Sequence, residues 1–305
     1  MPAPSLCFHR VFSQNREGRF WELCLAVSAL LLGVLISASS FAQDPGQRVV
    51  TLGSDVTEIV YALGEQKRLV GRDSTSNYPE EASSLPNVGY FRQLGAEGLL
   101  SLRPDLILAT TQAGPPELLN QIRGAGVKII TMPENFSPDG VLSKVEIIAG
   151  ALGAPDKGAK LSAHLRGEFD AAKALIGGMS GKPKVLFIIA AAGGAPMAAG
   201  THTGADALVG LAGGQNAFPG HTGYKTISLE AAAAAGPEAI AMMAQTLENL
   251  GGMPGVAENP ALRLTPAVRT RRVVARDGGY LLAFGPRLPK AMVDLARAIR
   301  GEEKK

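Results

Sequence analysis

The chain has 305 residues, of which 46% are hydrophobic and 19% are charged. This composition is typical of a globular protein, and the length suits two domains or lobes. The formal net charge of +3 is too small for a nucleic-acid-binding protein, because such proteins neutralise many phosphates.

The first 42 residues have the order of a secretory signal. Arg10, Arg16 and Arg19 precede an apolar stretch at 23–36, and small residues follow as far as Ala42. This order predicts a cleaved signal peptide over residues 1–42. The apolar stretch is shorter than the roughly 20 residues that a bilayer span needs. We therefore expect a soluble periplasmic protein rather than a membrane-anchored one.

The two cysteines, Cys7 and Cys24, both lie in the predicted signal peptide. The mature chain would then have no disulfide, no thiolate metal site and no cysteine nucleophile. Cys24 lies at the start of the apolar stretch, whereas a lipid-modified cysteine would lie at its C-terminal end.

From residue 48 onward, short apolar runs alternate with helical stretches. In the first half the pattern predicts strands over 48–53, 69–72, 105–109 and 128–132, and helices over 55–63, 96–102 and 115–123. A helical region over 138–176 follows, and it is divided near Pro155, because proline fits the first turn of a new helix. In the second half we predict strands over 184–190, 238–243 and 272–276, and helices over 204–211, 228–235 and 286–300.

Strands that alternate with helices predict parallel pairing in an α/β fold. We therefore expect two lobes with parallel central sheets joined by one long helix: an N-terminal lobe over 43–152, a connecting helix over 153–180 and a C-terminal lobe over 181–305. A cleft between two lobes is a common ligand site. A weak repeat supports the duplication, since Glu97 and Glu230 are each followed seven residues later by a Pro-acid pair that leads into a predicted strand.

Several segments carry a family resemblance. The segment RVVTLGSDVTEIVYAL (48–63) resembles the start of the mature helical-backbone solute-binding proteins, or class III periplasmic binding proteins, which serve ABC importers of cobalamin, siderophores and haem. Four further segments resemble the hemin-binding branch of this family more specifically: GRDSTSNYPEEA (71–82), NVGYFRQLGAEGLLSLRPDLIL (87–108), PMAAGTHTGADALVGLAGGQNAF (196–218) and YLLAFGPRLP (280–289). The resemblance implies a monomeric periplasmic receptor, not an enzyme, which hands hemin to a permease in the inner membrane.

The resemblance also implies that a tyrosine in the loop after the second strand ligates the haem iron, and the matching residue is Tyr78. Pro79 biases Tyr78 toward an extended conformation. A phenolate oxygen is a hard anionic ligand that suits ferric iron, and tyrosinate ligation of haem occurs in proteins. A nearby cation favours the phenolate, and Arg92 is a better candidate for that cation than Arg72.

Haem has a flat apolar face and two propionates, so its site needs apolar walls and cationic donors. Phe91, Tyr224 and Phe284 are predicted walls, and Arg92 is a predicted propionate partner. Further candidates were found among aromatic, methionine and basic residues of the same segments: Tyr90, Met197, Phe218, Lys225 and Arg287. Each of these residue types is also common in protein cores or on solvated surfaces.

Some hemin receptors of this family carry a histidine in a strand-to-loop region of the second lobe. The corresponding stretch here, 189–194, has no histidine. This departure leaves open a second iron ligand and a second stacked haem. His202 and His221 lie in predicted loops of the second lobe, and solvent-facing or structural roles are the alternative for both.

Glu97 and Glu230 match the positions at which the family carries one acidic residue on top of each lobe for permease arginines. Two separated carboxylates supply orientation and electrostatic steering. The alternative is that each residue only favours the N-terminus of its helix.

Two other readings of the function stay open at this stage. One is a different ligand, cobalamin or a ferric siderophore, on the same scaffold. The other is an extracytoplasmic enzyme with a cleft, although the chain has neither a Gly-x-Ser-x-Gly motif nor a Gly-x-Gly-x-x-Gly motif in the required strand-to-helix context.

Overall fold

The computed structural model describes residues 46–192 and 195–302, so the predicted signal peptide lies outside the described residues. The first half contains a parallel sheet of four strands in the order β2-β1-β3-β4. Its elements are β1 (Val49–Leu52), α2 (Ser54–Ala62), β2 (Leu69–Arg72), α3 (Ala96–Ser101), β3 (Leu106–Thr110), α4 (Pro116–Gly124) and β4 (Lys128–Met132). Every predicted strand and helix of this half is present, with its bounds within one residue of the prediction. We call this half the N-terminal lobe.

Strands β1 and β3 are buried along almost their whole length, as parallel strands covered on both faces are. The turn from β1 into α2 requires glycine. Gly53 has φ 123°, and a Cβ there would lie 2.9 Å from Asp55 Oδ1. The close turn places the first residues of α2 at the carboxyl end of the sheet, where ligands bind in open α/β folds.

The second half, here called the C-terminal lobe, contains a mixed sheet in the order β10-β9-β5-β6-β8, with β7 paired to β5. Its strands are β5 (Lys184–Ala192), β6 (Ala195–Ala199), β7 (Gln215–Asn216), β8 (Tyr224–Thr226), β9 (Ala239–Met243) and β10 (Val273–Arg276). Strands β5, β9 and β10 are parallel, as predicted. Strands β6 and β8 add an antiparallel extension that was not predicted.

The helices of this lobe are α7 (Gly204–Leu211), α8 (Leu229–Ala235), α9 (Ala244–Asn249), α10 (Gly252–Glu258), α11 (Pro266–Arg269), α12 (Gly278–Leu282) and α13 (Leu288–Ala298). The predicted helices correspond to α7, α8 and α13, and the four short helices α9 to α12 were not predicted. Two 3₁₀ turns, Gln66–Arg68 and Glu80–Ser84, complete the elements of the described chain.

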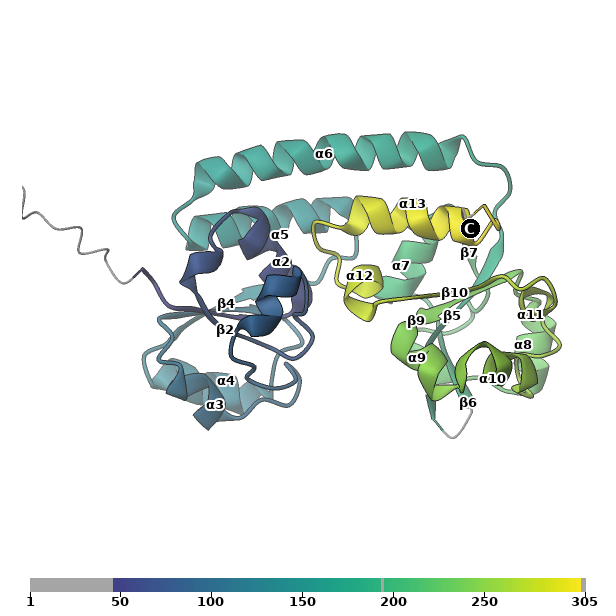
Figure 1. Ribbon diagram of the computed structural model, residues 1–305, viewed down its shortest axis with the longest axis horizontal. Helices are drawn as coiled ribbons and strands as arrows, with labels where there is room; N and C mark the ends of the chain where they lie inside the picture. Colours follow the sequence, from purple (N-terminus) through teal and green to yellow (C-terminus); the bar gives the residue numbers. More distant parts are fainter. Residues whose placement is uncertain (1–45, 193–194, 303–305) are drawn as a thin grey trace, which may run out of the picture. The chain divides into compact units, whose positions relative to one another are not determined.

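A pair of helices connects the two lobes. Helix α5 (Pro138–Ala151) begins at Ser137, whose Oγ accepts a hydrogen bond from the Gly140 amide, and α6 (Pro155–Gly177) begins with Pro155. Helix α6 packs against α5 and also against α13, and Figure 1 shows it running above both sheets. One apolar core extends from Val49 of β1 to Ile299 after α13. The predicted α/β class is therefore confirmed, while the residue boundaries predicted for the lobes stay a prediction.

No helix within the described ranges is both long and apolar enough to cross a membrane.

Candidate functional site

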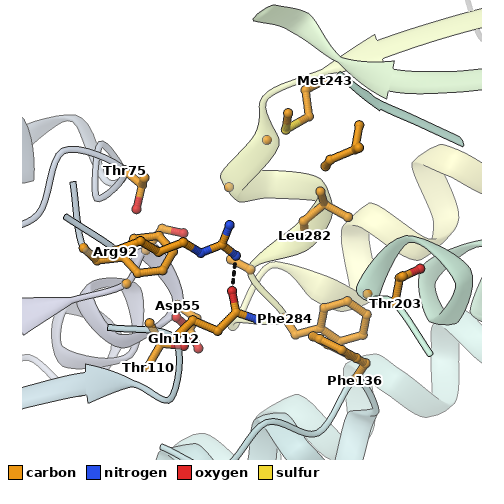
Figure 2. A pocket seen from close by; sticks show the side chains of 18 of the residues that line it. Asp55, Thr75, Arg92, Thr110, Gln112, Phe136, Thr203, Met243, Leu282 and Phe284 are labelled. Carbon is orange, nitrogen blue, oxygen red and sulfur yellow. Dashed lines mark hydrogen bonds between the residues drawn. The ribbon is translucent and has the colours of Figure 1, made fainter. Parts of the chain in front are cut away.

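A cavity of about 1020 Å³ lies between the two lobes. This volume is at the upper end of the range for small-molecule sites, which is about 300–1,000 Å³. Its walls come from both sheets, and Figure 2 shows residues of the two lobes facing one another across it. Six of the residues predicted as candidate ligand contacts line the cavity: Tyr90, Phe91, Arg92, Met197, Tyr224 and Phe284.

The loop after β2 reaches the cavity through Thr75 and Asn77, and the fully buried Asp73 shapes it. The Asp73 carboxylate accepts hydrogen bonds from the amides of Gly53 at 2.9 Å and Thr75 at 2.8 Å. It also accepts from the hydroxyls of Thr75 and Ser76, each at 2.5 Å. Four donors on one buried carboxylate fix the start of the loop relative to the turn between β1 and α2, because charge-assisted hydrogen bonds are the strong ones.

Arg72 fixes the other end of this loop. Its buried guanidinium donates to the carbonyl oxygens of Asp73, Ala82 and Ser83 and to Oδ1 of Asn77. Through these bonds Arg72 holds the segment 73–83 together. The sequence-based suggestion that Arg72 supplies a cation to Tyr78 therefore finds no support, since its donors point at backbone carbonyls.

Tyr78 lies between these two anchored ends, and 49% of the residue is exposed. It is not among the residues that line the cavity, although its neighbour Asn77 is. The Tyr78 ring instead packs under Arg287, whose guanidinium carbon lies 3.8 Å from the ring centroid. Arg287 precedes α13 of the C-terminal lobe, so Tyr78 lies where the two lobes touch, beside the cavity.

Arg287 also joins the lobes by a bidentate ion pair with Glu58 of α2. The Arg287 Nε–Glu58 Oε2 distance is 2.9 Å and the Nη2–Oε1 distance is 2.5 Å. Burial raises the pKa of Glu58, and the hydrogen bond and charge of Arg287 offset only part of this effect. Burial alone would lower the pKa of Arg287, but the bond to Glu58 raises it, so the arginine stays charged.

A second polar contact crosses between the lobes at the cavity wall. Lys144 of α5 lies 2.5 Å from Asp55 of α2 and donates to the Ala283 carbonyl oxygen at 3.3 Å. Lys144 and Asp55 are both buried. A buried pair of this kind costs desolvation of both ions, and loss of either partner leaves the other uncompensated. Sequence reasoning did not identify this pair, because its members are separated by 89 residues.

Arg92 also lines the cavity, from the N-terminal lobe. Its guanidinium donates to Gln112, and Gln112 donates to Glu134 at 2.6 Å, as Figure 2 shows for the first of these contacts. Arg92 is exposed and stacks over Phe91, with 5.2 Å between the guanidinium carbon and the ring centroid. The cation on the Tyr78 ring is thus Arg287 rather than Arg92, and Arg92 is free of any carboxylate within the described residues.

The aromatic residues of the C-terminal lobe form part of the wall. Phe284 is 2% exposed and packs on Phe136 with 5.2 Å between ring centroids, so it closes the cavity and also belongs to the core. Tyr224 of β8 lines the cavity, and burial raises its pKa while the charge of Arg92 on the facing lobe lowers it. Phe284 and Tyr224 thus line the same cavity from different elements of the C-terminal lobe.

The two histidines of the C-terminal lobe differ. His202 lines the cavity and has φ 59°, a conformation that is uncommon for residues other than glycine but less so for histidine. The His221 ring packs at the edge of Gly200, and its Nε2 has no hydrogen-bond partner within the described part of the chain. Within the same ranges, no group of three or more His, Cys, Asp or Glu side chains is placed to hold a metal ion.

Glu97 and Glu230 lie in the first turns of α3 and α8, one in each lobe. Both are exposed. Hydrogen bonds from Ser228 and from its own backbone amide lower the pKa of Glu230. The structure therefore leaves both carboxylates available on the surface and away from the cavity.

The charged side chains along the cavity are predominantly acidic. The lining includes two cations and four carboxylates: Arg92, Lys144, Asp55, Glu134, Glu248 and Asp277. Such a wall disfavours a ligand that carries many negative charges, because like charges placed together are destabilising. Of the two cations in this lining, Lys144 is paired with Asp55, so Arg92 is the one available to an anionic group of a ligand.

Two α/β lobes with a cleft between them and a pair of helices across them define a periplasmic binding protein. A family model described as "Periplasmic binding protein" matches residues 49–278, and the chain belongs to this family. It is 40% identical to the periplasmic heme-binding protein BhuT, a structure containing two hemes, over 84% of this chain and 99% of that one, with a TM-score of 0.81. The same values hold for the heme-binding protein RhuT from Roseiflexus sp. RS-1.

A heme-binding protein from Pseudomonas aeruginosa is 36% identical over 85% of this chain and 94% of that one, with a TM-score of 0.78. Among curated proteins, the vitamin B12-binding protein of Vibrio campbellii is 29% identical over 50% of this chain. The matched region spans about half the length of that relative, at 53%.

Proposed function

We propose that this protein is a periplasmic receptor that binds hemin in the interlobe cavity and delivers it to the permease of an ABC importer. The observation that carries the proposal is the similarity to periplasmic heme-binding proteins at 36–40% identity over nearly the whole described chain. The likeness to vitamin B12-binding proteins is lower and covers half of the chain in the first match. The protein would act as a monomer that binds its cargo without converting it.

The lining of the cleft supports hemin over a ferric siderophore on the same scaffold. The acidic lining disfavours a polyanionic ferric siderophore, whereas a porphyrin needs apolar walls, which Phe91, Met197 and Phe284 supply. The Tyr78 hydroxyl has no hydrogen bond to any other described residue, and the residue is half exposed. It is therefore available as an iron ligand, since a phenolate oxygen suits ferric iron.

Absorption spectra of the purified protein, residues 43–305, with hemin test this proposal. We expect the Soret and charge-transfer bands of ferric haem on tyrosinate, loss of the charge-transfer band in Tyr78→Phe, and retention of that band in Tyr61→Phe. Both substitutions remove one hydroxyl. A protein that binds cyanocobalamin but not hemin would refute the proposed cargo, and an unchanged spectrum in Tyr78→Phe would refute the ligand.

For delivery, we propose that Glu97 and Glu230 contact arginines of the permease. The variant carrying Glu97→Lys and Glu230→Lys should bind hemin with an unchanged spectrum, because both residues lie away from the cavity, yet fail to support growth on hemin as the iron source. Normal growth of this variant would contradict the docking role. The predicted export is checked by sequencing the N-terminus of the periplasmic protein, which should begin at Gln43.

A further inference from the structure

The two lobes touch beside Tyr78, at a contact between the segment 279–287 and helix α2. The segment from Gly279 to Arg287 lies directly on the N-terminal part of α2. A Cβ on Gly285 would lie 3.2 Å from the Asp55 Cα and 3.4 Å from Glu58 Oε2, and one on Gly279 would lie 3.5 Å from the Ser54 Cβ. The backbones of the two lobes thus pass close to each other here, and an added Cβ on Gly285 would make a tight contact with α2.

Arg287 is the side chain of this contact that stacks on Tyr78. It lies between two tyrosine rings, 3.8 Å from the Tyr78 centroid and 5.1 Å from the Tyr280 centroid. Its fork is held by both oxygens of Glu58. The Glu58 side chain is only 3% exposed and that of Arg287 is 21% exposed, so the pair is shielded from much of the solvent screening that weakens surface ion pairs.

We infer that Arg287 is a positioning residue for the iron ligand Tyr78, and that its ion pair with Glu58 makes this positioning depend on the contact between the lobes. The inference rests on the proposed function. Arg287 fixes the plane of the phenol ring and places a positive charge beside it, and Glu58 fixes Arg287. Separation of the lobes withdraws the arginine from the tyrosine, because the two belong to different lobes, and the bond from the phenolate to the iron weakens.

The first experiment compares Arg287→Ala, Arg287→Lys and Glu58→Ala with Lys290→Ala as the matched control. Lys290 is a cation in the first turn of α13, directly after Arg287, and it contacts Tyr280 and Asp294 but neither Glu58 nor Tyr78. The readouts are the wavelength of the tyrosinate charge-transfer band and the rate of hemin transfer to apomyoglobin. Thermal unfolding without hemin identifies variants that fail to fold.

In Arg287→Ala we expect a shifted charge-transfer band and hemin transfer about tenfold faster, the effect of losing a partly desolvated cation–π contact. Arg287→Lys should recover part of the rate, since lysine keeps the charge but loses the bidentate fork and the flat stacking surface. Glu58→Ala should shift the band in the same direction as Arg287→Ala, and Lys290→Ala should leave it in place. A wild-type band in Arg287→Ala, or an opposite shift in Glu58→Ala, would overturn the inference.

The dependence on the lobe contact has its own test. The Cβ–Cβ distance of 3.5 Å between Ser54 and a side chain built on Gly279 falls in the range for disulfides, and the chain beyond residue 24 contains no other cysteine. In Ser54→Cys/Gly279→Cys we expect hemin transfer at least about tenfold slower after oxidation and faster again after reduction by a phosphine. Equal rates in the two redox states would show that the lobes need not part.

These outcomes separate the inference from the proposed function. If the wild-type protein does not bind hemin, the proposed function fails, and if it binds hemin without a tyrosinate band, the ligand assignment and the inference fail together. If the wild type shows the band and Arg287→Ala matches it in both readouts, the inference alone fails.

Discussion

Replacement of Asp73 by alanine should cost more stability than any exposed substitution in the same lobe. The change removes the acceptor of four hydrogen bonds from a fully buried position. The two hydroxyl donors, on Thr75 and Ser76, can rotate toward other acceptors. The amides of Gly53 and Thr75 cannot turn away, so they are left without an acceptor.

An unsatisfied buried donor costs about 1–3 kcal/mol, so we expect Asp73→Ala to lose about 3–5 kcal/mol of unfolding free energy. For a domain of this size, each kcal/mol lowers Tm by about 2–4 °C, which gives a fall of about 10 °C. Urea unfolding followed by circular dichroism measures the free energy, and calorimetry measures Tm.

Asp105→Ala is the control, because Asp105 is exposed and accepts from the Arg48 amide. Asp73→Asn should fall between the wild type and Asp73→Ala, since one acceptor oxygen is kept. A loss below about 1 kcal/mol in Asp73→Ala, or equal losses in the two alanine variants, would refute the role assigned to this carboxylate. Hemin binding by Asp73→Ala, measured well below its Tm, should also weaken, because the loop before Tyr78 loses its anchor.

Two further predictions concern ion pairs. Lys144→Met should lower the free energy of unfolding by about 3–5 kcal/mol, because it leaves Asp55 charged and unpaired in a buried site. Adding Asp55→Asn should restore part of this loss, as measured by urea unfolding. Strictly additive losses in the double variant would contradict the pairing. The hydrogen bond from Lys157, at 2.7 Å, lowers the pKa of Glu65. Its contribution to the free energy of unfolding is therefore fully present above the pKa of about 4.3 that the carboxyl group has in the unfolded chain, and it is lost as the pH falls through the lower pKa of the folded state. Glu65→Gln should thus be less stable than the wild type by up to about 1 kcal/mol at pH 7, with the difference disappearing in acid, and a constant difference across pH would rule out this origin.

Local patterns predicted the parallel strands and long helices well, because each is encoded by a continuous run of residues. Strand β4 and helix α7 have the predicted bounds. Strands β6 and β8 were missed because APMAA and YKT are too short to show an alternation and form through their pairing with each other and with β5. The short helices α9 to α12 were missed for a similar reason, since fewer than eight residues give little periodicity.

The candidate site was predictable as a set of residue types but not as a set of partners. Phe91, Arg92, Tyr224 and Phe284 were predicted as ligand contacts from the chemistry that haem requires, and all four line the cavity. The partner of Tyr78 was not predicted, because Arg287 is 209 positions away and belongs to the other lobe. Only the folded chain shows that Arg72, the nearer arginine, is occupied by carbonyl oxygens.

Helix α13, at the end of the chain, completes the apolar core that contains residues of both lobes. Leu288, Met292 and Leu295 are buried there against residues of much earlier segments, and the Arg300 guanidinium binds carbonyl oxygens of Ser180, Gly181, Ala212 and Gly213. Without α13, apolar side chains of earlier segments that share this core would be exposed to solvent. A single helix therefore couples the packing of one lobe to the packing of the other.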